Sequence, residues 1–102
     1  MLFARVVGNV VSTQKEEKLV GRKLLLVQPA DPQGAPKAAT PLVAIDAVGA
    51  GEGELVLIVQ GSSARQTAKT EGTPVDCTII AIVDNVELGG KTVFRKNEDG
   101  GK

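Results

Sequence analysis

The chain has 102 residues, which fits one domain and leaves no room for a second. Twelve basic and twelve acidic side chains give a formal net charge of zero, so no long-range field favours nucleic acid or an anionic membrane. Histidine is absent, which removes the commonest general base and the commonest metal ligand. Tryptophan and tyrosine are also absent, which leaves few aromatic side chains on which nucleotide bases could stack. No stretch approaches the roughly 18 apolar residues of a membrane span, and the N-terminus lacks the pattern of a signal peptide. We therefore expect a small cytoplasmic protein that has no catalytic, cofactor or metal site and binds neither nucleic acid nor membrane.

The apolar residues predict five strands. Valine (14) and isoleucine (5) dominate them, and β-branched side chains favour strands over helices. The five apolar blocks, each bounded by turn-forming residues, are 2–12, 23–29, 42–48, 54–60 and 75–86. The link 49–53 is too short for a parallel crossover and predicts a hairpin, while 62–69 predicts one short helix between the fourth and fifth strands. The expected fold is an all-β, small five-stranded antiparallel barrel, closed so that no edge strand is exposed.

Several of these strands are apolar on both faces. In the fourth strand Leu55 and Leu57 alternate with Val56 and Ile58, whereas a lone antiparallel barrel should carry polar residues on its outer face. Each such side chain left in water forfeits about 1.5–3 kcal/mol, and several together make a patch larger than monomers usually tolerate. We therefore expect an oligomer rather than a monomer whose loops fold back, with Val56 and Val83 on the outward face that a partner covers.

Two glycine-containing motifs resemble catalytic loops, but each lacks a required residue. The stretch 49–53 is followed by Glu54 where a dinucleotide-binding loop needs glycine, and a strand follows instead of a helix. The stretch 61–65 has Arg65 where the serine-hydrolase turn needs glycine, and no histidine is present to activate a serine. We interpret the first as a turn with positive φ, and the second as a helix N-cap whose hydroxyls and amides could also hold an anion.

Three carboxylates, Asp46, Asp76 and Asp84, lie within or beside apolar strands. Buried there, each must be hydrogen-bonded or paired, and three scattered carboxylates without histidine are poor transition-metal ligands. We expect buried ion pairs, formed within or between chains. The candidate partners are Arg5, Arg22 and Arg65.

The remaining features have structural interpretations. Cys77 is the single cysteine, so no disulfide can form within the chain, and its place inside a strand indicates a buried apolar role. Residues 95–102 are charged and glycine-rich, which predicts a flexible tail after one barrel domain at 1–94.

Four blocks of sequence match a known family in order and spacing. They are Phe3–Thr13 with Leu19–Leu25, Asp46–Glu54 running into Val56-Leu57, Gly61–Arg65, and Asp76 with Ile80–Asp84. On these residues the chain resembles the EutN/CcmL family, the vertex proteins of bacterial microcompartments, over nearly its whole length (1–94). The loop 30–41 carries no pattern of the family.

The resemblance implies a barrel similar to the oligonucleotide-binding (OB) fold, assembled as a cyclic homo-pentamer. That pentamer would cap the fivefold vertices of a polyhedral shell in the cytoplasm, beside hexameric or pseudohexameric facet proteins, and would catalyse no reaction. The resemblance places two glycine-containing groups near subunit contacts or the fivefold axis: Gly49, Gly51, Gly53, Gly61, Ser62, Ser63 and Arg65. Two alternatives remain. An OB-fold protein binding single-stranded nucleic acid would need a basic groove with aromatic side chains, and a small enzyme could use a pair of carboxylates.

Overall fold

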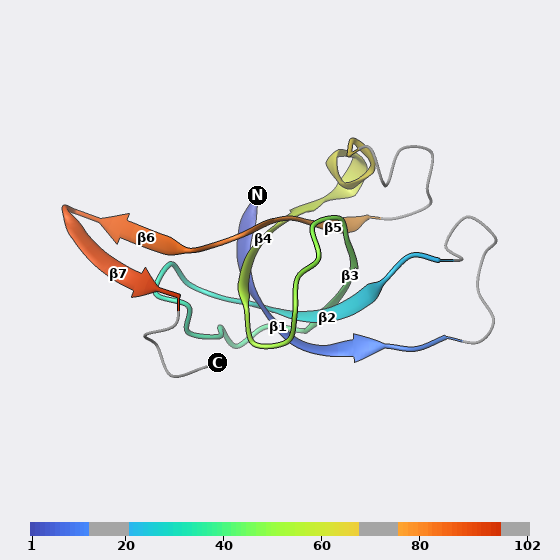
Figure 1. Cartoon of the computed structure of the whole chain (residues 1–102), viewed down its shortest axis with the longest axis horizontal. Helices are drawn as coiled ribbons and strands as arrows, with labels where there is room; N and C mark the ends of the chain where they lie inside the picture. Colours follow the sequence, from blue (N-terminus) through green and yellow to red (C-terminus); the bar gives the residue numbers. More distant parts are fainter. Residues whose placement is uncertain (13–20, 68–75, 97–102) are drawn as a thin grey trace.

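The centre of the molecule is a closed barrel of five strands in the order β1-β2-β3-β5-β4 (Figure 1). A computed structural model describes residues 1–12, 21–67 and 76–96. The barrel strands are β1 (Leu2–Val10), β2 (Leu24–Pro29), β3 (Leu42–Asp46), β4 (Leu55–Gln60) and β5 (Cys77–Ile82). The predicted all-β, closed five-stranded barrel is confirmed.

The long first strand closes the barrel because it pairs on both sides. Residues 2–5 pair with β4 and residues 4–10 pair with β2, so Ala4 and Arg5 have partners on both sides; both pairings are antiparallel. The register with β2 shifts between Val6 and Gly8, where a bulge lets the strand bend. Glycine suits such a place, since glycine within a strand commonly marks a bend.

Two details of the predicted topology differ from the structure. β3 and β5 pair in parallel, Ile45 with Thr78 and Asp46 with Ile79, so the barrel is not wholly antiparallel. The hairpin predicted at 49–53 is wrong, because β3 and β4 are not neighbours and residues 47–54 cross the barrel between them (Figure 1). A short link does exclude a parallel crossover between its two strands, but it does not require those strands to pair.

Aliphatic side chains from all five strands fill the barrel. The buried members of this core are Ala4, Val6, Leu25, Val27, Ala44, Ala50, Val56, Ile58, Cys77 and Ile79. Val56 is fully buried inside the barrel, so the prediction that it faces outward is wrong. Alternation separates the two faces of a strand, but where both faces are apolar it does not say which one turns inward. The buried position predicted for Cys77 is confirmed, and desolvation raises the pKa of its thiol to about 11.

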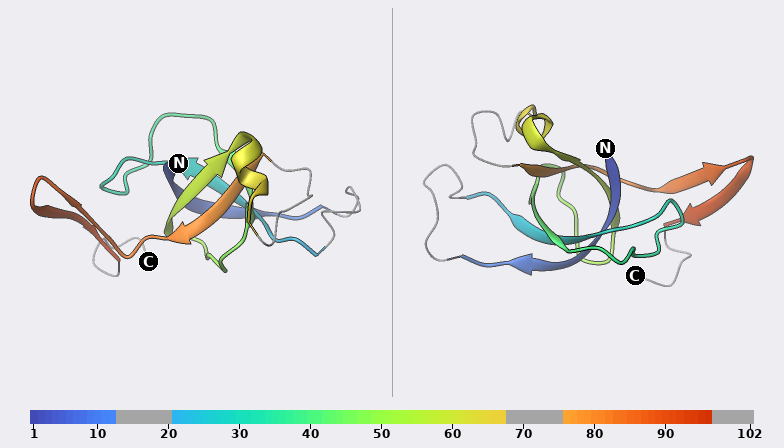
Figure 2. Two further views of the ribbon diagram at one scale, coloured as in Figure 1. Left: turned by 90° about the horizontal axis from the view of Figure 1, so that it is seen from above. Right: turned by 180° about the vertical axis from the view of Figure 1, so that it is seen from behind.

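A β-hairpin that the apolar pattern did not indicate follows the barrel. β6 (Asn85–Leu88) and β7 (Lys91–Arg95) form a separate two-stranded sheet that extends away from it (Figure 2). The turn between them contains Gly89 and Gly90, both at positive φ, as tight hairpin turns require.

This hairpin changes the predicted end of the fifth strand and the predicted start of the tail. The fifth strand ends at Ile82 rather than Val86, and Arg95, assigned to the tail, is the last residue of β7. Residues 97–102 of the predicted tail lie outside the described residues, and the division of the chain at residue 94 stays a prediction.

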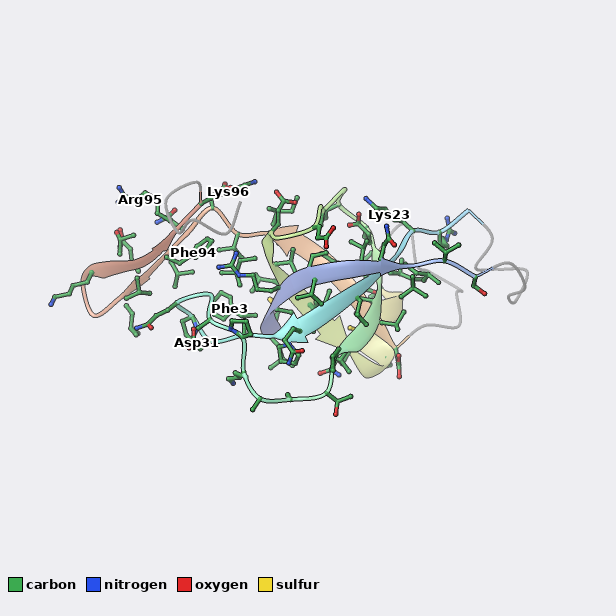
Figure 3. The ribbon with its side chains drawn as sticks, turned by 90° about the horizontal axis from the view of Figure 1, so that it is seen from below. Phe3, Lys23, Asp31, Phe94, Arg95 and Lys96 are labelled. Carbon is green, nitrogen blue, oxygen red and sulfur yellow. The ribbon has the colours of Figure 1, made fainter. Side chains whose placement is uncertain are left out.

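The base of the hairpin packs on the outside of the barrel. A second apolar cluster joins β1, β4 and β7 there, and Figure 3 shows Phe3 and Phe94 in it between the barrel and the hairpin. With its partly buried members, the cluster contains Ala30, Leu55, Phe94, Phe3, Val83 and Val86. The chain itself therefore covers Leu55 and part of Val83. For these two residues an apolar outer face does not require a partner.

A 3₁₀-helix, η2 (Gly61–Arg65), lies beside the ends of β4 and β5 (Figure 1). The Gly61 amide donates to the Asp76 carbonyl at 2.8 Å, and the buried Thr78 hydroxyl donates to the Ala64 carbonyl at 2.6 Å. A helical segment thus occurs where one was predicted, as a five-residue 3₁₀-helix. Residues 68 and 69 of the predicted span lie outside the described part.

Candidate assembly site

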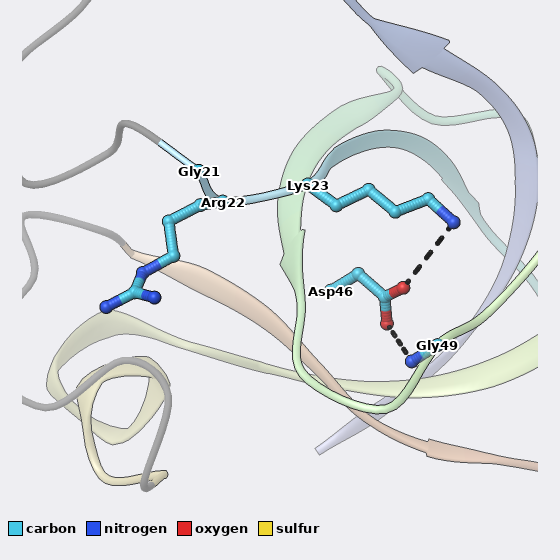
Figure 4. A pocket seen from close by; sticks show the side chains of 5 residues that line it. All are labelled: Gly21, Arg22, Lys23, Asp46 and Gly49. Carbon is cyan, nitrogen blue, oxygen red and sulfur yellow. Dashed lines mark hydrogen bonds and ion pairs between the residues drawn. The ribbon is translucent and has the colours of Figure 1, made fainter.

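The glycine-rich loop between β3 and β4 (residues 47–54) begins at a buried carboxylate. Asp46 lies at the end of β3 and is 9% exposed. Its Oδ1 accepts hydrogen bonds from the Val48 and Gly49 amides, each at 3.0 Å. Figure 4 shows the bond from Gly49. Gly49 has a φ of 84°, which L side chains rarely adopt, so the turn interpretation of this glycine is confirmed.

Within the described part of the chain, Asp46 lies beside the side chain of a lysine. Lys23 Nζ lies 3.9 Å from Asp46 Oδ2 and donates to the Ala50 carbonyl at 3.0 Å. Lys23, Asp46 and Gly49 line an open hollow of about 360 Å³ together with Gly21 and Arg22. The Arg22 side chain points away from Asp46 (Figure 4). Strand register places Asp46 beside Lys23, whose carbonyl accepts the Asp46 amide at 3.0 Å. Pairing of Asp46 with an arginine, within or between chains, stays a prediction.

The far end of the loop is tied to β1 and to the second cluster. The Gly53 amide donates to the Val6 carbonyl at 2.7 Å, and the Val6 amide donates to the Glu54 carbonyl at 3.0 Å. Arg5 donates through Nη1 to the Gly53 carbonyl at 2.7 Å and through Nε to the Gly34 carbonyl at 2.9 Å. The sequence predicted Arg5 as a partner of a carboxylate; in the structure it donates to the backbone carbonyls of two different loops.

Glu54 is the last residue of the loop, and each of its two carboxylate oxygens contacts a different partner. Its Oε1 accepts the Gly51 amide at 2.6 Å, and its Oε2 lies 2.9 Å from Lys96 Nζ, just after β7. The hydrogen bond from Lys96, with that from Gly51, lowers the pKa of Glu54. The hydrogen bond between Lys96 and Glu54 also raises the pKa of Lys96.

Acidification is expected to remove the stabilisation that Glu54 provides. Since its folded pKa lies below the usual 4.5, the carboxylate stabilises the fold above that pH, and this is lost as pH falls through the folded pKa. The Lys96 contribution is complete below 10.5 and is lost as pH rises through its raised pKa. The urea midpoints of the parent and of Glu54→Gln should therefore differ at neutral pH, and the difference should shrink as the pH falls through the folded pKa of Glu54. A difference that stays constant as the pH is lowered until the parent itself unfolds would contradict the ion pair.

The residues that the resemblance placed near subunit contacts fall into two groups. Gly49 is exposed at the start of the β3–β4 loop, and Gly51 and Gly53 are half-buried toward its end. Gly61 and Ser62 are exposed on η2, and the side chains of Ser63 and Arg65 lie outside the described atoms. Because Gly53 precedes β4 and Gly61 follows it, these two glycines lie at opposite ends of that strand.

Asp76 and Asp84 are exposed in the single chain, so the burial predicted for them is not found there. Their backbone carbonyls have structural roles: the Asp76 carbonyl accepts the Gly61 amide at 2.8 Å, and the Asp84 carbonyl accepts the Lys96 amide at 2.7 Å. Pairing of either carboxylate with a neighbouring copy stays a prediction.

An exposed apolar surface covers the outside of β1, β2 and β3. We call it the β1–β3 face and define it by Val7, Leu26 and Val43. Val7 is 43% and Val43 48% exposed, and Leu26 lies opposite Val43 with its own neighbours along β2 buried in the core. Sequence alternation had indicated such a surface on other strands, and the register of β2 with β3 identifies where it lies.

The arrangement offers little chemistry. Within residues 1–12, 21–67 and 76–96, no three acidic or sulfur side chains gather closely enough to hold a metal ion. The same part of the chain has no helix with the length and apolar character needed to cross a membrane. Phe94 is buried and Phe3 half-buried in the second cluster, which leaves neither ring displayed as a platform for stacked bases.

Comparison with known proteins agrees with a structural role. Residues 1–84 match the family described as "Ethanolamine utilisation protein EutN/carboxysome". The microcompartment shell vertex protein EutN of Escherichia coli is 50% identical over 96 residues, which are 94% of this chain and 100% of that protein. The solved structure of Gloeobacter violaceus CcmL is similar with a TM-score of 0.87 and 46% identity, covering 94% of this chain and 98% of that one.

A third relative is a pentamer. The GrpN pentameric microcompartment shell protein from Rhodospirillum rubrum gives a TM-score of 0.78 at 42% identity, covering 86% of this chain and 99% of that one. The family match over most of the sequence, together with a relative 50% identical along nearly the whole chain, shows that this protein belongs to the EutN/CcmL family.

Proposed function

We propose that this protein forms a ring of five copies that caps the fivefold vertices of a bacterial microcompartment shell. The observation that carries this function is the nearly full-length relationship to shell vertex proteins, one of which is a pentamer. The protein is a structural component of the shell rather than an enzyme. The nucleic-acid alternative loses support, since the two aromatic rings it would use pack against the barrel.

The β1–β3 face supports association between copies. Val7 and Val43 are valines more than 40% exposed on one outer surface, where a partner would remove apolar area from water. A ring forms when two different surfaces of each copy meet head to tail and the rotation closes. We infer that this face is one of those two surfaces.

The glycine-containing groups are proposed as further contacts. Added Cβ atoms at Gly49 and Gly61 would meet nothing within 4 Å in the single chain, so a neighbouring copy has room to approach both backbones. Gly51, Gly53, Ser62, Ser63 and Arg65 belong to the same two segments and are proposed with them.

Mass in solution tests the ring. Native mass spectrometry at micromolar concentration should give a species of five times 10.6 kDa. A monomer throughout that range would contradict the proposal, and a hexamer would contradict the fivefold geometry. Val43→Lys should dissociate the ring while each copy stays folded, because burying an unpaired charge costs several kcal/mol. Ala38→Lys, at an exposed loop position, is the matched control, and a Val43→Lys ring that stays intact would remove the β1–β3 face from the interface.

The neighbours of the ring are proposed to be hexameric or pseudohexameric facet proteins. The ring must exist before it docks, so contacts to the facets should be weaker and more polar than those within it. In a host with the other shell genes, deletion of this gene should leave elongated or leaky shells while the enclosed enzymes stay active in lysate. Closed shells of normal shape in that strain, with no second vertex gene, would contradict the vertex role.

A further inference from the structure

Two segments that are not part of the barrel sheet contact each other. One is the β3–β4 loop, and the other is the hairpin of β6 and β7, which runs away from the barrel (Figure 2). A hairpin of two strands is at best marginally stable alone in water, so its position depends on what holds its base. The base is held by Phe94 in the second cluster and by Lys96 just beyond β7.

Glu54 belongs to the loop and contacts both segments. The Gly51 amide donates to Glu54 Oε1 at 2.6 Å, and this bond shapes the turn of the loop. Lys96 Nζ lies 2.9 Å from Glu54 Oε2, and this ion pair holds the end of the hairpin. The Lys96 amide also donates to the Asp84 carbonyl at 2.7 Å, which closes the hairpin base. One carboxylate thus positions a loop amide and the residue that closes the hairpin.

Arg5 makes a second, separate connection between the same segments. Its Nη1 donates to the Gly53 carbonyl at 2.7 Å, and its guanidinium carbon lies 5.3 Å from the centre of the Phe94 ring, a cation–π distance. Displacing β7 would remove the Phe94 ring from Arg5 and Lys96 from Glu54 together.

We propose that Glu54 and Arg5 couple the order of the β3–β4 loop to the docking of the β6–β7 hairpin. A contact that holds either segment then stabilises the other, and such coupling is reciprocal by thermodynamic necessity. In a vertex protein this links a partner bound at the hairpin to the glycine loop without a change of the barrel. The coupling is a property of one chain and goes beyond the proposed assembly.

Amide hydrogen exchange of the full-length protein, read by NMR, tests the coupling. Lys96→Met removes the partner of Glu54 on the hairpin side and changes no residue of the loop. It should speed exchange of the Gly51 amide by about two- to fivefold, the effect of losing one solvent-accessible ion pair. Lys91→Met, an exposed lysine at the start of β7, is the matched control and should leave Gly51 unchanged. Lys96→Arg should restore the slow exchange.

The reciprocal variant starts from the loop. Glu54→Gln keeps an oxygen for the Gly51 amide but loses the ion pair, so exchange of the Lys96 amide at the hairpin base should rise by a similar factor. Unchanged Gly51 exchange in Lys96→Met, while the hairpin amides exchange faster, would overturn the proposal and leave Lys96 as a local contact. Equal acceleration in Lys91→Met would also overturn it, because the effect would then be general. Native mass spectrometry of the same samples reports the assembly separately, so failure of the ring and failure of the coupling are distinguishable.

Discussion

Val56→Lys is expected to prevent the barrel from folding. Val56 is fully buried in the barrel core, between Ala4 of β1 and Ile82 of β5 in the strand register. A lysine there would bury a charge with no partner or displace core side chains, at a cost of several kcal/mol. Single domains of this size are stable by about 5–15 kcal/mol in all, so most of that margin would be lost.

Far-ultraviolet circular dichroism and urea unfolding measure this effect. The variant should lack a cooperative transition or show it at a much lower urea concentration than the parent. Val43→Lys places the same charge on the exposed β1–β3 face and should keep the cooperative transition of the folded chain. A Val56→Lys variant with the parental midpoint would show that β4 turns its other face inward.

Gly34→Ala is expected to destabilise the contact between the 30–36 loop and the hairpin. Gly34 has a φ of 87°, a conformation that costs an L residue about 1–2 kcal/mol. An added Cβ would also lie 2.7 Å from Arg5 Nη2 and 2.9 Å from Phe94 Cδ1, closer than real Cβ atoms approach. The Arg5–Phe94 stack would have to move, so the loss should exceed the backbone cost.

The matched control is Gly90→Ala in the hairpin turn. Gly90 has a φ of 82°, but its added Cβ would meet nothing within 4 Å, so only the backbone cost applies. Urea midpoints of the two variants separate the contributions: Gly34→Ala should fall below Gly90→Ala by about 1–3 kcal/mol in unfolding free energy, within the range of core strain. Equal losses would show that Arg5 and Phe94 yield to the methyl group without cost.

Much of the barrel could be predicted from local patterns. β-Branched blocks between turn residues indicated all five barrel strands, because side-chain preference and turn chemistry act over a few residues. The same local rules identified Gly49 as a positive-φ turn residue and Cys77 as a buried apolar side chain. The family, and through it the vertex role, could also be recognised from the order and spacing of four sequence blocks.

The tertiary structure alone decided which strands are neighbours and which apolar face turns inward. The parallel β3–β5 pair, the inward side of Val56 and the lysine partner of Asp46 all depend on residues distant in sequence. Local patterns did not indicate the β6–β7 hairpin because its strands are short and mix polar with apolar residues, and Phe94 and Val86 are covered by contacts in the second cluster. Local sequence carries propensity and alternation, but register and burial arise from contacts that form only when the whole chain has folded.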